Sequence, residues 1–327
     1  MKFICDPNFI QSMYLKGNIR ENVLSSLEHV LYVCENVLDK DTHYKIKEII
    51  VLYRKINFSS GFLFFIIKEI SNAIEKKLMD RISYCFNLIP LLILENRKIF
   101  IANSENLSPE LFDFYSNIKD DVYSFSCVDE YMESNSVIDK LENSFEIIKK
   151  YDDELYKEIF TIVDEFFIFK SNTVEGDVVY SGSDFNKLGT VFINYEILKK
   201  ENYFIVDKII HESAHQILLS IMTVDEVVLN SDNERYPSPL RKELRTMNGI
   251  YHAAFVLYRL SGFFYKIVKS NDEDKDAYLN LTKNLRQFKS CYKVIMEKGN
   301  LTNLGKSIID KCNLYVEDIL NENYRNS

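Results

Sequence analysis

Glycine and proline, the residues that most often interrupt helices and strands, are rare in this chain, with nine glycines and five prolines among 327 residues. Apolar residues recur instead at three- and four-residue spacing over long stretches, as at Val23, Leu27 and Val30. This spacing places them on one face of a helix. Because 21 tyrosines and 23 phenylalanines supply large apolar side chains, the sequence predicts a mainly helical protein with aromatic-rich packing.

One segment departs from the helical pattern. Residues 173–195 contain several glycines between two short β-branched and aromatic runs, 178–180 and 190–193, which predict a small antiparallel pair of strands. Helical periodicity covers residues 10–100 and 136–169, and it returns after the strands. The predicted fold class is therefore α+β, mainly helical, with a small antiparallel sheet beside a helix that carries the HExxH motif described below.

Residues 120–135 are acidic and irregular, and they are the best candidate for a domain boundary. The sequence thus predicts a helical N-terminal region over residues 1–130, with peptide recognition as its candidate role. Residues 131–327 form the predicted metal-binding catalytic domain.

Charge and apolar runs limit the classes of partner. The net charge is −9, and basic residues alternate with acidic ones along most of the chain, so that no basic stripe forms and nucleic-acid binding is not expected.

The most apolar runs, 61–67 and 86–94, are much shorter than the roughly 20 residues of a membrane-spanning helix. The N-terminus does not resemble a signal peptide, and the six cysteines form no close pair. A cytoplasmic protein with reduced thiols and no membrane association is expected, with its oligomeric state open.

The chemistry-bearing motif is His211-Glu212-Ser213-Ala214-His215. Residues four apart share a helix face, so that both imidazoles can bind one metal ion. Glu212 projects beside that ion, either as a base toward metal-bound water or as an acceptor that orients a ligand.

A third ligand is needed to complete a metal site. His252, the only histidine after the motif, lies in a predicted second helix. The metzincin continuation is absent because Leu218 and Ile221 replace its glycine and histidine. The gluzincin pattern needs a glutamate on a following helix, whereas Glu234 falls in a predicted loop. The carboxylate candidates are Asp225, Glu226, Glu234 and Glu243.

Two arginines follow the motif. Arg241 and Arg245 are four residues apart, and a helix that begins near Pro239 would place them on one face. Guanidinium groups bind carboxylates in a bidentate manner, which would suit an anionic substrate or co-substrate. Solvated arginines at a helix start are the alternative.

Together these elements carry a resemblance. His-Glu-Ser-Ala-His-Gln, then Tyr-Pro-Ser-Pro-Leu-Arg with Arg245 four residues on, then Gly-Ile-Tyr-His-Ala-Ala-Phe-Val, resemble the HExxH-motif family of enzymes that modify ribosomally made peptides. Members of that family are β-hydroxylases dependent on Fe(II) and 2-oxoglutarate. The resemblance covers roughly residues 136–260.

The resemblance implies Fe(II) held by His211, His215 and His252, and a 2-oxoglutarate carboxylate held by Arg241 or Arg245, with Ser238 of the same element as a further cofactor-binding candidate. The implied substrate is a peptide or precursor peptide. A third histidine departs from the usual set of two histidines and one carboxylate, which leaves the third ligand open.

Two other functions are compatible with the sequence. One is a zinc metallopeptidase that uses Glu212 as its general base. The other is a non-enzymatic helical binding protein.

Overall fold

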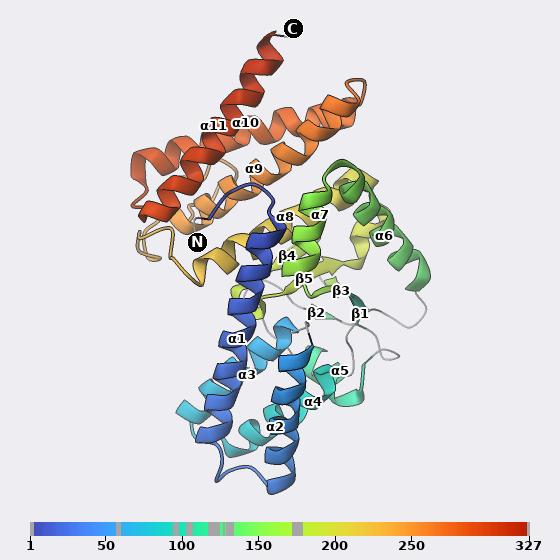
Figure 1. Cartoon of the computed structure of the whole chain (residues 1–327), viewed down its shortest axis with the longest axis vertical. Helices are drawn as coiled ribbons and strands as arrows, with labels where there is room; N and C mark the ends of the chain where they lie inside the picture. Colours follow the sequence, from blue (N-terminus) through green and yellow to red (C-terminus); the bar gives the residue numbers. More distant parts are fainter. Residues whose placement is uncertain are drawn as a thin grey trace. The chain divides into compact units, whose positions relative to one another are not determined.

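The computed structural model of the chain describes residues 3–56, 60–93, 98–102, 107–116, 125–126, 128, 134–171 and 179–325. They fall into two compact units, each assembled from several segments of the sequence. The first, the sheet unit, comprises residues 14–140 and 162–200. The second, the histidine unit, comprises residues 1–13, 141–161 and 201–327. The described residues are mainly helical with a small sheet (Figure 1), which confirms the predicted α+β class.

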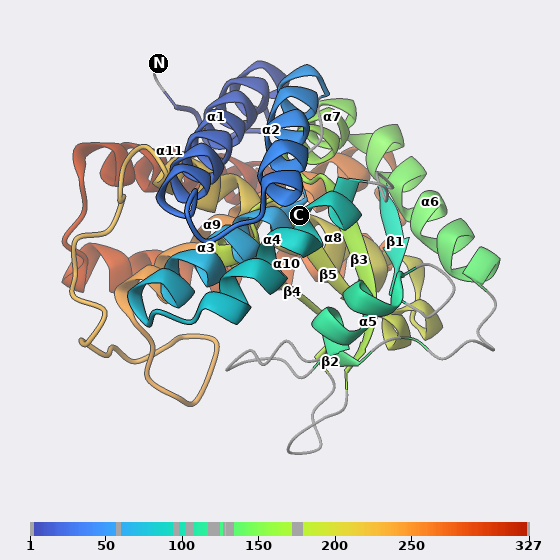
Figure 2. The ribbon, with the colours of Figure 1, turned by 90° about the horizontal axis from the view of Figure 1, so that it is seen from below.

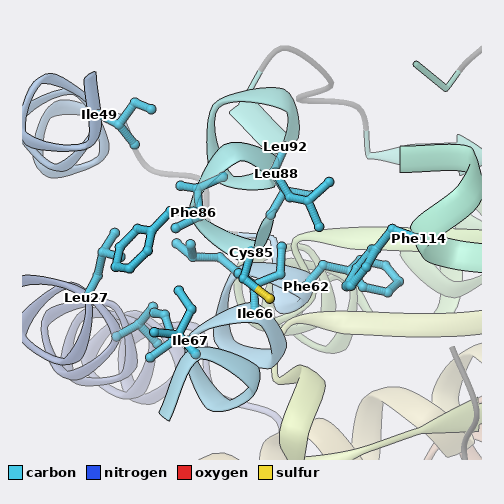
Figure 3. Packing of buried hydrophobic residues seen from close by; sticks show 14 of the residues in the cluster. Leu27, Ile49, Phe62, Ile66, Ile67, Cys85, Phe86, Leu88, Leu92 and Phe114 are labelled. Carbon is cyan, nitrogen blue, oxygen red and sulfur yellow. The ribbon is translucent and has the colours of Figure 1, made fainter. Parts of the chain in front are cut away.

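The sheet unit consists of short helices, a sheet and an aromatic-rich core. Figure 3 shows part of this core, in which Cys85 lies beside Ile66 and Phe86 points toward Leu27. Asp39 and Ser60 cap two of the helices by accepting hydrogen bonds from the first-turn amides of Thr42 and Phe62. The elements of this unit are α1 (Phe9–Val33, which begins in the histidine unit), α2 (Lys40–Lys55), α3 (Gly61–Glu75), α4 (Met79–Ile93), β1 (Ile99–Ile101), α5 (Pro109–Ser116), β2 (Phe125–Ser126), β3 (Glu165–Ser171), β4 (Ser181–Ser183), η1 (Phe185–Lys187), β5 (Thr190–Asn194) and η2 (Tyr195–Lys199).

The sheet is mixed, not antiparallel as predicted. Its strand order is β1-β3-β5-β4 (Figure 2), and β1, β3 and β5 are parallel to one another. Strand β4 pairs with β5 in the antiparallel direction, and β2 pairs in the same way with the end of β3. The connection from β1 to β3 includes α-helices, whereas the described part of the connection from β3 to β5 contains β4 and the short η1. Neither parallel pair is closed by a tight turn.

Two strands occupy positions that the sequence assigns to helices. Residues 165–171 form β3, although the predicted helix over 136–169 includes most of them. Ile99–Ile101 form β1, at the end of the predicted N-terminal helical stretch. Of the predicted strand over 178–180, residue 178 lies outside the described residues, and Val179 and Tyr180 precede the observed strand β4. The predicted strand over 190–193 is confirmed as β5.

The regular elements of the histidine unit are all helices within its described residues. Helix α9 packs against α8, α10 and α11, and α9 and α10 form the long pair drawn in orange in Figure 1. Asp274 caps α10 by accepting a hydrogen bond from Ala277 N (2.9 Å). None of the helices in the described ranges is long and apolar enough to cross a membrane. The elements are α6 (Ser134–Tyr151, which begins in the sheet unit), α7 (Asp153–Ile162), α8 (Asn202–Met222), α9 (Met247–Ser270), α10 (Lys275–Lys298) and α11 (Asn303–Arg325).

The sheet and the HExxH helix belong to different units, and their predicted proximity stays a prediction. The separate recognition role of residues 1–130 also stays a prediction, as does the catalytic role of residues 131–327.

The start of α11 packs closely against the chain that follows α8. A Cβ atom on Gly305 would lie 2.1 Å from the carbonyl oxygen of Val227, and Val227 itself has a positive φ of 56°. The carbonyl of Gly305 accepts a hydrogen bond from the hydroxyl of Tyr251 on α9 (2.8 Å). Only glycine at position 305 allows this approach of two backbones.

We therefore expect Gly305→Ala to destabilise the protein by about 1–3 kcal/mol, because backbone must move to make room. Urea denaturation followed by circular dichroism measures the change. Gly17→Ala is the matched control, since a Cβ atom there meets nothing within 4 Å. It should leave stability unchanged or raise it by up to about 1 kcal/mol, because Gly17 lies inside a helix. Equal stability of the Gly305→Ala variant and the unaltered protein would contradict the close packing of α11.

Candidate metal centre

Helix α8 carries His211 and His215, and the helix predicted for this motif is confirmed. The two side chains are half-buried, and their ring centroids lie 5.0 Å apart. The rest of α8 is largely enclosed, with Ile209, Ile210 and Ile217 among its buried residues. A buried helix fixes the position of the motif within the histidine unit, because such close packing leaves it little room to shift.

Helix α9 brings His252 to the same place. Its Nδ1 atom lies 3.0 Å from Nδ1 of His215, and the two rings stack with centroids 5.2 Å apart and an interplanar angle of 27°. The other ring nitrogen of His252, Nε2, lies 3.3 Å from Sδ of Met222. The three histidines therefore form one cluster between α8 and α9.

Burial keeps His215 and His252 uncharged. It lowers the pKa of His252 to about 4 and the pKa of His215 well below the usual value for histidine, with a further lowering of the His215 pKa by His211 and His252. At neutral pH both imidazoles are therefore neutral. A neutral imidazole has a free lone pair, which is the form that binds a metal ion.

The separation of His215 and His252 fits a pair of metal ligands. Two nitrogen ligands at right angles, each about 2.1 Å from an ion, are themselves about 3.0 Å apart. Without a metal ion, the same separation suits an N–H···N hydrogen bond between the rings.

The third ligand is not in place. Within the described residues, no three side chains of the histidine, cysteine, aspartate or glutamate type have the spacing of a ligand set. The assignment of His211 as the third ligand stays a prediction.

Glu212 lies on the same helix between the two histidines. Its side chain is 5% exposed, so that it faces the protein interior. A buried carboxylate next to neutral imidazoles is suitably placed to orient a ligand or accept a proton. Its predicted role is untested.

A helix that begins near Pro239, the condition under which the two arginines would share a face, is not present among the described residues. Residues 223–246 are an irregular loop, and α9 begins at Met247 with Thr246 as its cap. Arg241 and Arg245 therefore do not share a helix face, and both are exposed. The backbone of Arg245 instead pairs with that of Tyr236 through two hydrogen bonds of 2.8 and 2.9 Å. The physical reason is that residues 241–245 are exposed throughout, with Leu244 56% exposed, and offer no apolar face to bury.

Ser238 is half-buried in this loop, and its hydroxyl accepts a hydrogen bond from Leu240 N (3.4 Å). The binding of 2-oxoglutarate by Ser238, Arg241 or Arg245 stays a prediction. The loop supplies exposed guanidinium groups close in sequence to the start of the helix that carries His252.

Two residues near the cluster were not predicted from the sequence. Met222 contacts His252, and a methionine at a helix end gives no signal of that contact. The Oδ1 atom of Asn248 is buried without a hydrogen-bond partner among the described residues. Asn248 lies four residues before His252 on α9, and this i, i+4 spacing is the signal that could have identified it.

Comparison of the sequence with models of known protein families and with curated proteins finds no match. The resemblance to the HExxH-motif β-hydroxylases therefore stays a prediction.

The depressed pKa of His252 predicts a pH dependence of stability in the metal-free protein. Between about pH 6.5 and pH 4 the unfolded chain binds a proton on residue 252 that the folded protein does not. The free energy of unfolding should therefore fall as the pH is lowered through this window, by on the order of 1–3 kcal/mol from this residue.

Urea denaturation at a series of pH values, with a chelator present, measures this contribution. His252→Gln should lose less stability than the unaltered protein over the same window, because glutamine does not titrate. Identical pH profiles would contradict the burial of a neutral imidazole.

Proposed function

We propose that this chain is an Fe(II)- and 2-oxoglutarate-dependent hydroxylase that acts on the β-carbon of a residue in a ribosomally made peptide or protein. One observation carries the proposal. His215 on α8 and His252 on α9 place two neutral imidazole nitrogens of half-buried side chains 3.0 Å apart, next to the His211 side chain. In the sequence these are the residues that resemble the family's metal ligands.

The residues of this chain would divide the work as follows. His215 and His252 hold the metal ion, with His211 as the third ligand. Arg241 or Arg245 would bind the distal carboxylate of 2-oxoglutarate, because a guanidinium group can donate two parallel N–H···O bonds to a carboxylate. Asn248 offers a buried amide oxygen without a partner among the described residues, which suits a polar group of the bound co-substrate or peptide.

The metal ion and 2-oxoglutarate, when bound, supply the oxidation. One oxygen atom of O2 enters succinate, which forms with loss of CO2, and the other enters the C–H bond of the peptide. The protein contributes orientation and exclusion of water.

The second candidate function is a zinc metallopeptidase. Catalytic zinc sites made only of imidazole ligands are common, whereas iron sites of this class usually include a carboxylate. The all-histidine cluster thus suits zinc as well as iron. Glu212, adjacent to His211 and buried, would act as the general base toward metal-bound water.

The deciding experiment begins with metal analysis of the purified chain. The protein is then stripped with a chelator, loaded anaerobically with Fe(II), and mixed with 2-oxoglutarate and the peptide encoded next to its gene. After air is admitted, we expect succinate to form and the peptide mass to rise by one oxygen atom. Tightly bound zinc with peptide cleavage that needs no 2-oxoglutarate would overturn the hydroxylase proposal and support the peptidase.

Arginine variants test the binding of 2-oxoglutarate without a peptide. Calorimetric titration of 2-oxoglutarate into the Fe(II)-loaded protein gives its affinity. We expect Arg241→Gln or Arg245→Gln to weaken binding at least about tenfold, because a charged hydrogen-bonding partner is lost. Lys242→Gln is the matched control, an exposed cation of the same loop, and should change affinity little. Unchanged affinity in both arginine variants would remove this loop from the site.

A further inference from the structure

Two thiols meet in the histidine unit, away from the histidine cluster. Cys5 precedes α1, and Cys312 lies on α11. Both side chains are buried, at 2% and 0% exposure, and their thiols share a hydrogen bond. They are distant in sequence, so that sequence spacing gives no indication of the pair.

Tyr258 on α9 contacts both the segment that carries Cys5 and the helix that carries Cys312. Its hydroxyl donates a hydrogen bond to Oδ1 of Asp6, the residue after Cys5. Its ring contacts that of Tyr315, three residues after Cys312 on α11, with centroids 5.7 Å apart. The segment 3–8 is thus held against α9 by a contact that does not involve sulfur, and α9 in turn contacts α11 beside Cys312.

A buried cation lies beside the pair. Arg259 forms an ion pair with Glu158 on α7 (2.8 Å), in which both side chains are 1% exposed. Its charge is balanced by this ion pair alone among the contacts that the described residues make with its guanidinium group. A positive charge at this place favours a thiolate and disfavours a bound metal cation.

Cys5 differs from the other buried cysteines in its acidity. The hydrogen bond with Cys312 is the main cause that lowers the pKa of Cys5 to about 7, and Tyr258 and Arg259 add to the effect. Burial instead raises the pKa of Cys85 to about 11 and that of Cys291 to about 12. Near neutral pH a substantial fraction of Cys5 is therefore thiolate, whereas burial keeps Cys312 a thiol.

We propose that Cys5 and Cys312 form a redox couple, which a peroxide converts into a disulfide that ties the segment 3–8 to α11. This inference is independent of the histidine cluster and of the proposed hydroxylase activity. The two thiols interact with each other and lie in the same buried region of the histidine unit, so that the bond can form by rearrangement of the two side chains and of segment 3–8.

The chemistry proceeds in two steps. The Cys5 thiolate attacks one oxygen of hydrogen peroxide, the O–O bond breaks, and Cys5 becomes a sulfenic acid as hydroxide leaves. The sulfur of Cys312 then attacks the sulfur of Cys5, its proton leaves with the hydroxyl group as water, and the S–S bond forms. In sum, two thiols and one hydrogen peroxide give one disulfide and two waters, with the sulfurs oxidised and the peroxide reduced.

Access to Cys5 requires only local opening. The segment 3–8 has no regular structure before α1, and its backbone is held by few hydrogen bonds, among them Asn8 N to Oε2 of Glu158 (2.9 Å) and Ile4 N to Oε1 of Gln11 (2.8 Å). Such segments open far more often than a whole domain unfolds. Hydrogen peroxide is small enough to enter through that opening.

Peptide mapping tests the proposal on the full chain. The reduced protein is treated with excess hydrogen peroxide at neutral pH, its remaining thiols are alkylated, and it is digested without reductant. We expect the peptides that contain Cys5 and Cys312 to appear joined, with a mass lower by two hydrogen atoms than their sum, and to separate on reduction. Amide hydrogen exchange over residues 3–13 should be slower in the oxidised protein.

Two serine variants provide the controls. Cys312→Ser should leave Cys5 as a sulfenic acid, trapped by a 1,3-diketone probe, because the resolving thiol is absent. Cys291→Ser, which removes a buried cysteine outside the pair, should form the disulfide as the unaltered protein does. Failure to link Cys5 with Cys312, or oxidation of Cys5 no faster than that of Cys85 and Cys291, would overturn the proposal.

Discussion

His215→Ala is expected to reduce the proposed peptide hydroxylation by about a thousandfold or more, as the loss of a group on which a reaction depends usually does. The variant should also lose tight binding of Fe(II). His215 is the central member of the cluster, since its ring lies 5.0 Å from that of His211 and 5.2 Å from that of His252. Its removal therefore leaves two histidines that no longer share a neighbour.

Equilibrium dialysis against Fe(II), followed by metal analysis, measures binding separately from turnover. His252→Ala should behave as His215→Ala does. His29→Ala is the matched control, because His29 is exposed on α1 and has no partner at metal-ligand spacing. Circular dichroism verifies that each variant is folded. Metal binding by His252→Ala equal to that of the unaltered protein would make His252 a packing residue and contradict the proposed centre.

Glu158→Gln should destabilise the protein by about 3–5 kcal/mol, because it removes one partner of a buried ion pair and leaves the charge of Arg259 uncompensated. Both side chains are 1% exposed, so that water cannot replace the lost carboxylate. Glu158 also accepts a hydrogen bond from Asn8 N through Oε2, which the glutamine side chain can retain through its oxygen. The charge is thus the main difference between the two residues.

Urea denaturation of three variants measures the free energy of unfolding. Their comparison separates the effect of the buried charge from that of the packing around it. Glu297→Gln is the matched control, since Glu297 and Lys293 form an exposed pair at 3.9 Å and such pairs contribute less than about 1 kcal/mol. The double variant Glu158→Leu with Arg259→Met should recover much of the stability lost in Glu158→Gln, because no buried charge remains. A change of under about 1 kcal/mol in Glu158→Gln would contradict an uncompensated buried cation.

Helices with one exposed face could be predicted from the sequence, because their apolar residues recur at three- and four-residue spacing. The HExxH helix is largely buried, and it was predicted from the apolar residues on both sides of the motif, among them Ile209 and Ile217. Strand β3 could not be recognised in this way. Residues 166–169 are four consecutive apolar residues, each at most 2% exposed, since a central parallel strand is covered on both faces. Such a run lacks the alternation that distinguishes a strand from a helix.

The sequence makes His252 a candidate neighbour of His215, but sequence spacing does not determine their approach. The approach depends on the path of residues 223–246 between α8 and α9, and an irregular loop leaves no periodic signal. The proline at position 239 suggested a helix start, whereas the helix starts at the capping Thr246, whose Oγ1 accepts a hydrogen bond from Gly249 N (3.1 Å). That threonine before an apolar run was the better signal. The third ligand depends on side-chain rotation, which sequence spacing does not encode.

The chain passes between its two compact units four times, and α1 and α6 each continue through one of these crossings. No single cut can therefore release either unit intact. A fragment that begins at residue 131 would keep all three site histidines but lose Cys5, Asp6 and Asn8, and with them the backbone partner of Glu158. Such a fragment should be far less stable than the whole chain, so that gene truncation is a poor route to a minimal catalyst and point substitution the better one.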